Sequence, residues 1–144
     1  MILVIPDTNV LMSGLLSAIN KERQIINLVH LNKISFYGSD ETFKEFCEVT
    51  KYERFKNYLY GKLYTPEKII ADYQDIVIID KPAKVYDNLS VASDKDDDEF
   101  IRVALSVGSK IIVTRDNHLL KLEEYQGIRM LTPETFIEAF SEMD

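Results

Sequence analysis

The chain has 144 residues and a formal net charge of −7, with 46% apolar and 28% charged residues. This length predicts one domain over residues 1–144, and no apolar run approaches the roughly 20 residues that a membrane span needs. The acidic balance excludes a general nucleic-acid coating protein, which needs a basic surface, but it does not exclude a metal-dependent nuclease. Residues 1–7 lack the pattern of a signal peptide and Cys47 is the only cysteine, so we expect a cytoplasmic protein.

Short runs of branched apolar residues predict five strands. The strands are expected at residues 2–5 and 111–113 and, with weaker patterns, at 34–37, 76–79 and 128–131. Between them lie segments with helical spacing of apolar residues, such as 25–32 and 100–107. This alternation predicts an α/β fold, a three-layer α/β/α sandwich around a central, mostly parallel five-stranded sheet.

Capping residues predict where several helices begin and end. Ser39 is a typical N-cap, and Pro66 and Pro133 suit the first turns of two later helices. Gly108 suits the end of a helix because glycine adopts the left-handed conformation found there. The polar stretch 81–98 predicts a loop around one short element.

Two aspartates, Asp7 and Asp116, follow the two clearest strands. The functional crevice of an open α/β sheet lies outside the carboxyl ends of its strands, so these residues are neighbours if their strands are adjacent. Two such charges about 4 Å apart repel by roughly 4 kcal/mol at an effective dielectric constant near 20, while a whole fold is stable by about 5 to 15 kcal/mol. Converging carboxylates therefore need a cation, a raised pKa or a basic partner, and oxygen ligands favour Mg²⁺ or Mn²⁺.

The acidic run 94–99 begins a helix, where acidic residues commonly complement the helix dipole. At 100° per residue, Asp97 lies on the same face as Phe100 and points toward the sheet, whereas Asp98 points away. Asp94 suits the N-cap. We therefore expect Asp97 to belong to the site and keep Asp98 in reserve.

Several polar residues near these acids suit supporting roles. Thr8 and Asn9 offer a hydroxyl and an amide that can hold a carboxylate or a bound water, although the same turn suits a simple N-cap. Thr114 can hydrogen-bond acidic neighbours, and Arg115 can neutralise part of the cluster, contact a substrate phosphate or serve as an ordinary ion-pair partner. Periodicity does not select Glu45, which lies beyond the edge of an apolar stripe.

Four short motifs occur in order: Asp7-Thr8-Asn9, Ser39 through Glu45, Asp94 through Ala104, and Thr114-Arg115-Asp116. In this order they resemble the PIN-domain family of metal-dependent ribonucleases, and most of all its VapC-like toxins from toxin-antitoxin pairs. The resemblance implies that the catalytic and metal-binding acids are Asp7, Glu45, Asp97 and Asp116, supported by Asn9 and Thr114. The chain departs from the family pattern at Lys95, where proline is common, and at His118, where a second acid is common.

The resemblance implies an endoribonuclease that uses Mg²⁺ or Mn²⁺ to hydrolyse RNA, leaving a 5′-phosphate and a 3′-hydroxyl. In such a site the metal ion activates water for in-line attack and stabilises the leaving oxygen. An antitoxin protein and a second copy of the chain are the partners it suggests. The alternatives are a PIN fold kept as a non-catalytic binding scaffold and a signalling receiver domain, whose phosphorylatable aspartate and later lysine at strand ends are not evident.

Cations and aromatic residues alternate within the segment 44–68. They are Lys51, Tyr52, Arg54, Phe55, Lys56, Tyr58, Tyr60, Lys62 and Tyr64. Aromatic rings can stack on RNA bases while cations contact phosphates. The same pattern also suits an amphipathic helical pair with solvated charges, or an interface with an antitoxin or a second subunit.

Overall fold

The structure is a computed structural model that describes residues 1–55, 64–92 and 95–143. Its strands are β1 (Ile2–Pro6), β2 (Ile34–Gly38), β3 (Val77–Ile79), β4 (Ile111–Val113), β5 (Glu124–Tyr125) and β6 (Ile128–Leu131). Its helices are α1 (Thr8–Leu16), α2 (Lys21–His30), α3 (Asp40–Val49), α5 (Pro66–Ile76), α6 (Lys95–Val107), α7 (Asn117–Leu120) and α8 (Pro133–Met143), with a short 3₁₀ helix η1 at Lys84–Tyr86. Lys56, Tyr58, Tyr60, Lys62 and Asp94, named above from the sequence, lie outside the described residues.

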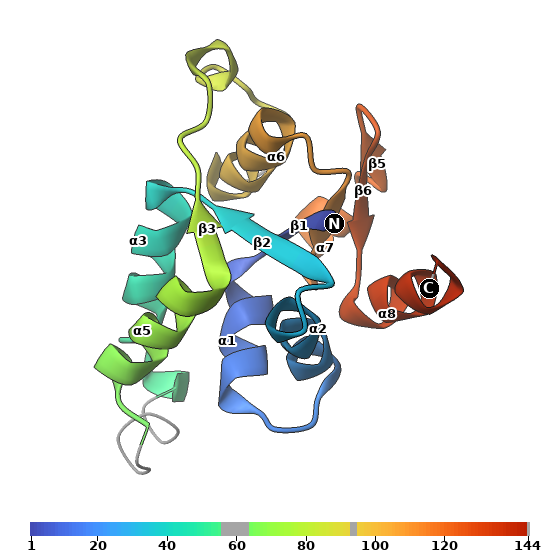
Figure 1. The fold of residues 1–144 in the computed structure, drawn as a ribbon. Coiled ribbons are helices and arrows are strands. Elements are labelled where there is room, and N and C mark those ends of the chain that lie inside the picture. The colour runs from blue at the N-terminus through green and yellow to red at the C-terminus, as the bar shows by residue number, and fades with distance from the viewer. Residues whose placement is uncertain (56–63, 93–94, 144) are drawn as a thin grey trace.

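The strands form one sheet in the order β3-β2-β1-β4-β6-β5 (Figure 1). All neighbouring strands are parallel except β5, which pairs antiparallel with β6. The predicted three-layer α/β/α fold and its mostly parallel sheet are confirmed. The sheet has six strands rather than five, because the two-residue strand β5, too short to be seen as an apolar run, adds to one edge.

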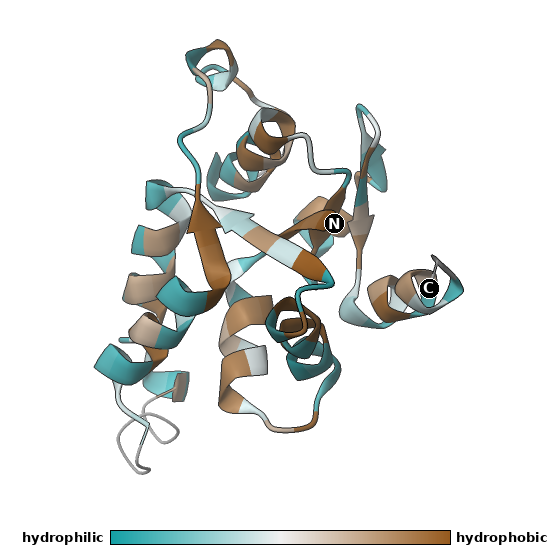
Figure 2. Cartoon of the chain, viewed as in Figure 1, coloured by the Kyte–Doolittle hydropathy of each residue, from teal (hydrophilic) through white to brown (hydrophobic). Residues whose placement is uncertain are grey.

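Alternating residues of the central strands separate two cores. Val4 and Val113 belong to the core shared with α1, α2, α5 and α8, whereas Ile5 and Ile112 belong to the core shared with α6 and α7. Successive side chains of a strand point to opposite faces, so a doubly covered strand is apolar throughout. Figure 2 shows these strands as brown ribbon between helices whose teal residues face outward.

The helix ends predicted at Ser39, Pro66, Gly108 and Pro133 are confirmed. The Ser39 hydroxyl accepts the N–H of Thr42, and the Thr42 hydroxyl accepts the N–H of Ser39, which forms a capping box at the start of α3. Pro66 and Pro133 open α5 and α8, and Gly108 ends α6 with a positive φ of 77°. In the described part of the chain, no helix combines the length and apolar character needed to cross a membrane.

Candidate active site

The carboxyl ends of β1 and β4 lie side by side at the centre of the sheet. Pro6 pairs with Val113, and the N–H of Asp7 donates to the carbonyl oxygen of Val113 at 3.0 Å. The two strands that precede Asp7 and Asp116 are therefore adjacent, as the prediction for these residues required. This edge is where an open α/β sheet places its functional crevice.

Asp7 is buried, with 5% of its surface exposed, at the junction of β1 and α1. One carboxylate oxygen, Oδ1, accepts the N–H of Val10 at 2.8 Å and caps α1, while Oδ2 accepts a hydrogen bond from the Thr114 hydroxyl. Burial raises the pKa of Asp7 above its ordinary value; the bonds from Thr114 and Val10 oppose this rise, and the charge of Asp116 adds to it. The carboxylate is therefore held rigidly in surroundings that disfavour its charge.

Thr114 joins Asp7 to Asp116. Its hydroxyl, which is fully buried, donates to Asp7 and accepts the N–H of Asp116 at 2.9 Å. Asp116 caps α7 by accepting the N–H of His118 at 2.8 Å. The predicted hydrogen bonding of Thr114 to an acidic neighbour is confirmed.

Glu45 reaches the same region from α3. The Thr8 hydroxyl, one residue after Asp7, donates to Oε2 of Glu45 at 2.8 Å. Glu45 is half-buried, as expected for a residue beside the apolar stripe of its helix. Thr8 therefore holds a carboxylate, which is one of the roles that the sequence analysis suggested for its hydroxyl.

The first turn of α6 carries two buried aspartates, Asp97 and Asp98, which are 7% and 2% exposed. Asp98 accepts the N–H groups of Val91 at 3.0 Å and Ala92 at 2.7 Å, so its carboxylate is bound by the backbone of the preceding loop, and the expectation that it points away from the sheet stays a prediction. The preceding loop folds over it, which helical phase alone does not reveal. Asp97 lies in the first turn of α6, and this helix packs against β1 and β2.

Two predicted supporting residues have other partners. Asn9 is exposed and accepts a hydrogen bond from Arg54 at 3.2 Å. Arg115 pairs with Glu22 at 2.8 Å and with Glu134 at 2.6 Å, and these bonds raise the pKa of its guanidinium. The ion-pair role of Arg115 is thus confirmed, with partners from α2 and α8, while its roles in neutralising the acidic cluster or contacting a substrate phosphate stay predictions.

A hollow of about 460 Å³ opens beside Glu45, between α3 and α6. Its lining residues are Glu41, Thr42, Glu45, Glu48 and Tyr52 on one side and Lys95, Asp96, Glu99 and Arg102 on the other. This volume lies within the roughly 300 to 1,000 Å³ of typical small-molecule sites. Of the four predicted acids, Glu45 is the one that lines this hollow.

Sequence reasoning missed the contacts that fix the loop above α6. Glu99 accepts the Ser39 hydroxyl at 2.7 Å and pairs with Arg102 at 3.1 Å. Arg102 in turn donates to backbone carbonyls of the loop, including those of Tyr86 and Leu89. The spacing of Glu99 and Arg102 by three residues was the available signal, although it predicts only their mutual pairing.

The four predicted acids supply the oxygen ligands that Mg²⁺ and Mn²⁺ prefer. Asp7 and Asp116 are joined through Thr114, and Glu45 is held by the residue next to Asp7. Among the described residues, however, no three acidic, histidine or cysteine side chains are grouped closely enough to hold a metal ion as they stand. The donor chemistry fits a divalent cation, while the carboxylates do not form a closed cage.

Residues 3–118, which include all four acids, match the protein family described as the PIN domain. The chain is also 30% identical over 145 aligned positions to an uncharacterized protein of Methanocaldococcus jannaschii, with 95% of this chain and 90% of that protein covered. The family match leaves the signalling receiver alternative without support. The chain belongs to the PIN-domain family, whose domains are generally nucleases.

Proposed function

We propose that this protein is an endoribonuclease that depends on Mg²⁺ or Mn²⁺ and binds the ion through Asp7, Glu45, Asp97 and Asp116. The observation that carries the proposal is the buried Asp7 carboxylate, whose pKa is raised by burial and by the charge of Asp116. Ionised carboxylates in such surroundings are stabilised by a bound cation, and this need supports a divalent metal ion as their partner. When bound, a divalent cation supplies Lewis acidity and an activated water for phosphodiester hydrolysis.

The protein's own residues prepare this site by fixing its carboxylates. Thr114 and the N–H of Val10 hold the two oxygens of Asp7, and Thr8 holds one oxygen of Glu45. Asp98 already accepts two backbone N–H groups, which supports Asp97 as the ligand from α6. Because no three of these groups are close enough to hold an ion as they stand, binding requires small side-chain movements toward the cation.

Ribonuclease activity can be tested with single-stranded and structured RNA, with Mn²⁺, with Mg²⁺ or with EDTA. Wild-type protein should cleave RNA only with the ion and leave a 5′-phosphate. The variants Asp7→Asn, Asp97→Asn and Asp116→Asn should each lose about 100-fold or more of the rate while remaining folded by circular dichroism. Glu134→Gln, which also removes one carboxylate but belongs to the Arg115 ion pairs, should retain full activity.

The outcomes separate the proposal from its alternatives. Cleavage that survives the Asp7, Asp97 and Asp116 substitutions would reject the four-acid assignment. RNA binding with no cleavage under any metal condition would instead support a non-catalytic scaffold. Asp98→Asn should keep Mn²⁺ affinity, and a loss as large as that of Asp97→Asn would move the ligand to Asp98.

The likeness to VapC-like toxins extends the proposal to a cytoplasmic toxin with an antitoxin partner and a homodimeric form. The toxin role is supported by the order of the four motifs and not by the geometry of the acids. It can therefore fail while the proposed catalysis holds. Induced expression should arrest growth of a host cell, and the Asp116→Asn variant should not. Harmless expression of a protein that cleaves RNA in vitro would argue against the toxin role alone.

A further inference from the structure

Three arginines, Arg54, Arg102 and Arg115, contact residues near the acidic edge of the sheet, and they differ in how their charge is compensated. Arg115 binds two glutamates, and Arg102 binds Glu99 as well as loop carbonyls. Arg54 contacts the Asn9 amide oxygen, and within residues 1–55, 64–92 and 95–143 it has no carboxylate partner. An exposed guanidinium without a carboxylate partner, beside an acidic site, is suited to bind a phosphate.

The position of Arg54 relates it directly to the acids. Its guanidinium donates to Asn9 at 3.2 Å, and the preceding residue, Thr8, holds Glu45. Asn9 also lies two residues after Asp7. The positive charge is therefore placed at the first turn of α1, the helix that Asp7 caps.

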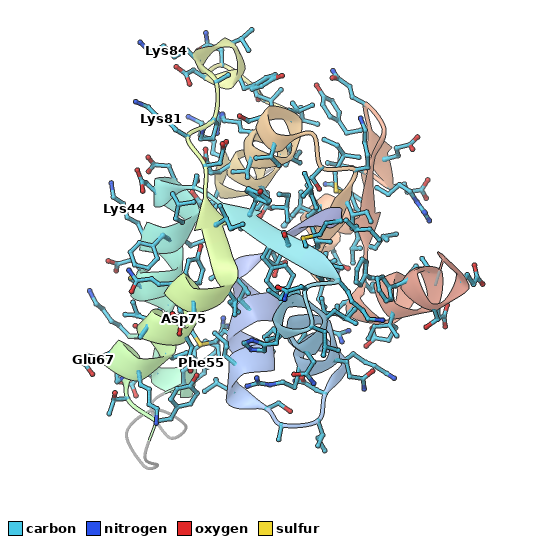
Figure 3. All side chains as sticks on the ribbon, viewed as in Figure 1. Lys44, Phe55, Glu67, Asp75, Lys81 and Lys84 are labelled. Carbon is cyan, nitrogen blue, oxygen red and sulfur yellow. The ribbon has the colours of Figure 1, made fainter. Side chains whose placement is uncertain are left out.

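Two aromatic rings orient the side chain of Arg54. Its guanidinium carbon lies 4.8 Å from the ring centre of Phe55 and 5.5 Å from that of Tyr52. Phe55, labelled in Figure 3, packs against the core shared with α1 and α5, so it anchors this segment. The contacts limit the freedom of the side chain before any ligand binds.

Tyr52 connects Arg54 to the hollow beside Glu45. It is 48% exposed and lines the hollow together with Glu41, Glu45 and Glu48, which repeat along one face of α3. Acids outnumber the two cations, Lys95 and Arg102, in the lining of the hollow, so a phosphate without a bound metal ion is repelled there. An unpaired base, in contrast, can stack on an exposed aromatic ring. Tyr52 thus offers a stacking surface in the hollow, and Arg54, which lies beside Tyr52, offers a contact for a phosphate.

We propose that Arg54 binds a phosphate flanking the cleaved bond and that the ring of Tyr52 stacks on an unpaired base of the same strand. This inference rests on the proposed ribonuclease function and assigns two residues that contact its substrate. Bases of a duplex are stacked on each other and are not free for the Tyr52 ring. Arg54 is therefore a substrate-binding residue, and it is not required for metal binding.

The test measures RNA affinity by fluorescence polarisation in the Asp97→Asn background, so that the RNA stays intact, over a series of KCl concentrations. Arg54→Ala should weaken binding about 10- to 100-fold and reduce the slope of log affinity against log salt by about 0.7. Tyr52→Ala should weaken binding about 5- to 100-fold, and Tyr52→Phe should not. Lys44→Ala is the matched control, because Lys44 is a cation of α3 whose side chain extends outward in Figure 3.

Calorimetry with Mn²⁺ on the Arg54 and Tyr52 single variants provides a second readout, and their Mn²⁺ affinity should equal that of the unsubstituted protein. Arg54→Ala behaving like Lys44→Ala, equal affinity for duplex RNA, or loss of Mn²⁺ binding in Arg54→Ala would each overturn the inference. If RNA binding depends on Arg54 and Tyr52 but the wild-type protein never cleaves RNA, the catalytic proposal fails and this binding surface stands. Absence of any RNA binding would overturn both.

Discussion

Three consecutive residues that follow β4, Thr114, Arg115 and Asp116, belong to two charged regions. In one region opposite charges are paired, and in the other, within the part of the chain that the structure describes, a buried carboxylate lacks such a pair. Arg115 turns toward α2 and α8, where Glu22 and Glu134 compensate its charge. The Thr114 hydroxyl joins the Asp7 carboxylate to the backbone N–H of Asp116, and the charge of Asp116 adds to the effect of burial in raising the pKa of Asp7. Charged residues that follow one strand can therefore either compensate one another, as Arg115 and its glutamates do, or leave a carboxylate in surroundings that disfavour its charge, as at Asp7.

The two regions also differ in how removal of a charge should act. In the Arg115 region each charge has a partner, so deleting the arginine leaves Glu22, which is 6% exposed, buried without its cation. In the Asp7 region, deleting one charge relieves repulsion. Removing a charge should therefore lower the free energy of unfolding in the Arg115 region. In the Asp7 region it should raise the free energy of unfolding of the metal-free protein and weaken metal binding.

The largest stability effect is expected from Arg115→Ala. Loss of the cation beside buried Glu22 should lower the free energy of unfolding by about 1 to 3 kcal/mol, measured by urea denaturation. Glu134→Ala removes only the more exposed partner and should cost about 0 to 1 kcal/mol. Equal costs for the two variants would show that burial of Glu22 does not govern this region.

Asp7→Asn should have the opposite sign in protein without metal. Asparagine can still cap α1, and removal of the repulsion with Asp116 should raise the free energy of unfolding by about 1 kcal/mol at pH 7. Because the folded-state pKa of Asp7 is raised, ionisation costs stability as pH rises past the ordinary aspartate value of about 3.9. The gain should therefore vanish below that pH, and a variant less stable than wild type at pH 7 would contradict it.

The smallest effect is the pH dependence of the Glu134 contact. Hydrogen bonds from Arg115 lower the pKa of Glu134, so its stabilising effect is present above the ordinary glutamate pKa and is lost as pH falls through the lowered value. Wild type should exceed Glu134→Gln by up to about 1 kcal/mol near pH 7, and the two should converge in acid. Denaturation curves at several pH values check this, and a difference that grows in acid would be inconsistent with it.

Local signals in the sequence were sufficient for most of the fold. Ser39, Pro66 and Gly108 act through their own backbone geometry and near neighbours, so the helix ends could be predicted. The central strands β1 and β4 were found because strands covered on both faces need continuous apolar runs, whereas β3, with Ile78 and Ile79 exposed, was found from its apolar residues alone. Adjacency of Asp7 and Asp116 then followed from the general rule for strand ends.

Contacts between residues far apart in the sequence could not be predicted from these local patterns. Arg115 finds Glu22 across 93 positions of the chain, and no local spacing reveals that pair. Burial of Asp98 depends on how the preceding loop folds back, and support of Glu45 depends on packing of α3 near Thr8. The sequence thus predicted two acids at strand ends that the pairing of β1 with β4 makes neighbours. The gathering of all four acids stays a prediction, and their individual partners required the tertiary structure.

The central proposition is that acids from four separate segments bind one divalent cation, and calorimetric titration with Mn²⁺ tests it most directly. Wild-type protein and the Glu134→Gln control should bind the ion alike, whereas Asp116→Asn and Glu45→Gln should bind it at least about 10-fold more weakly. Undetectable uptake by wild-type protein, or equal uptake by all four proteins, would contradict the account.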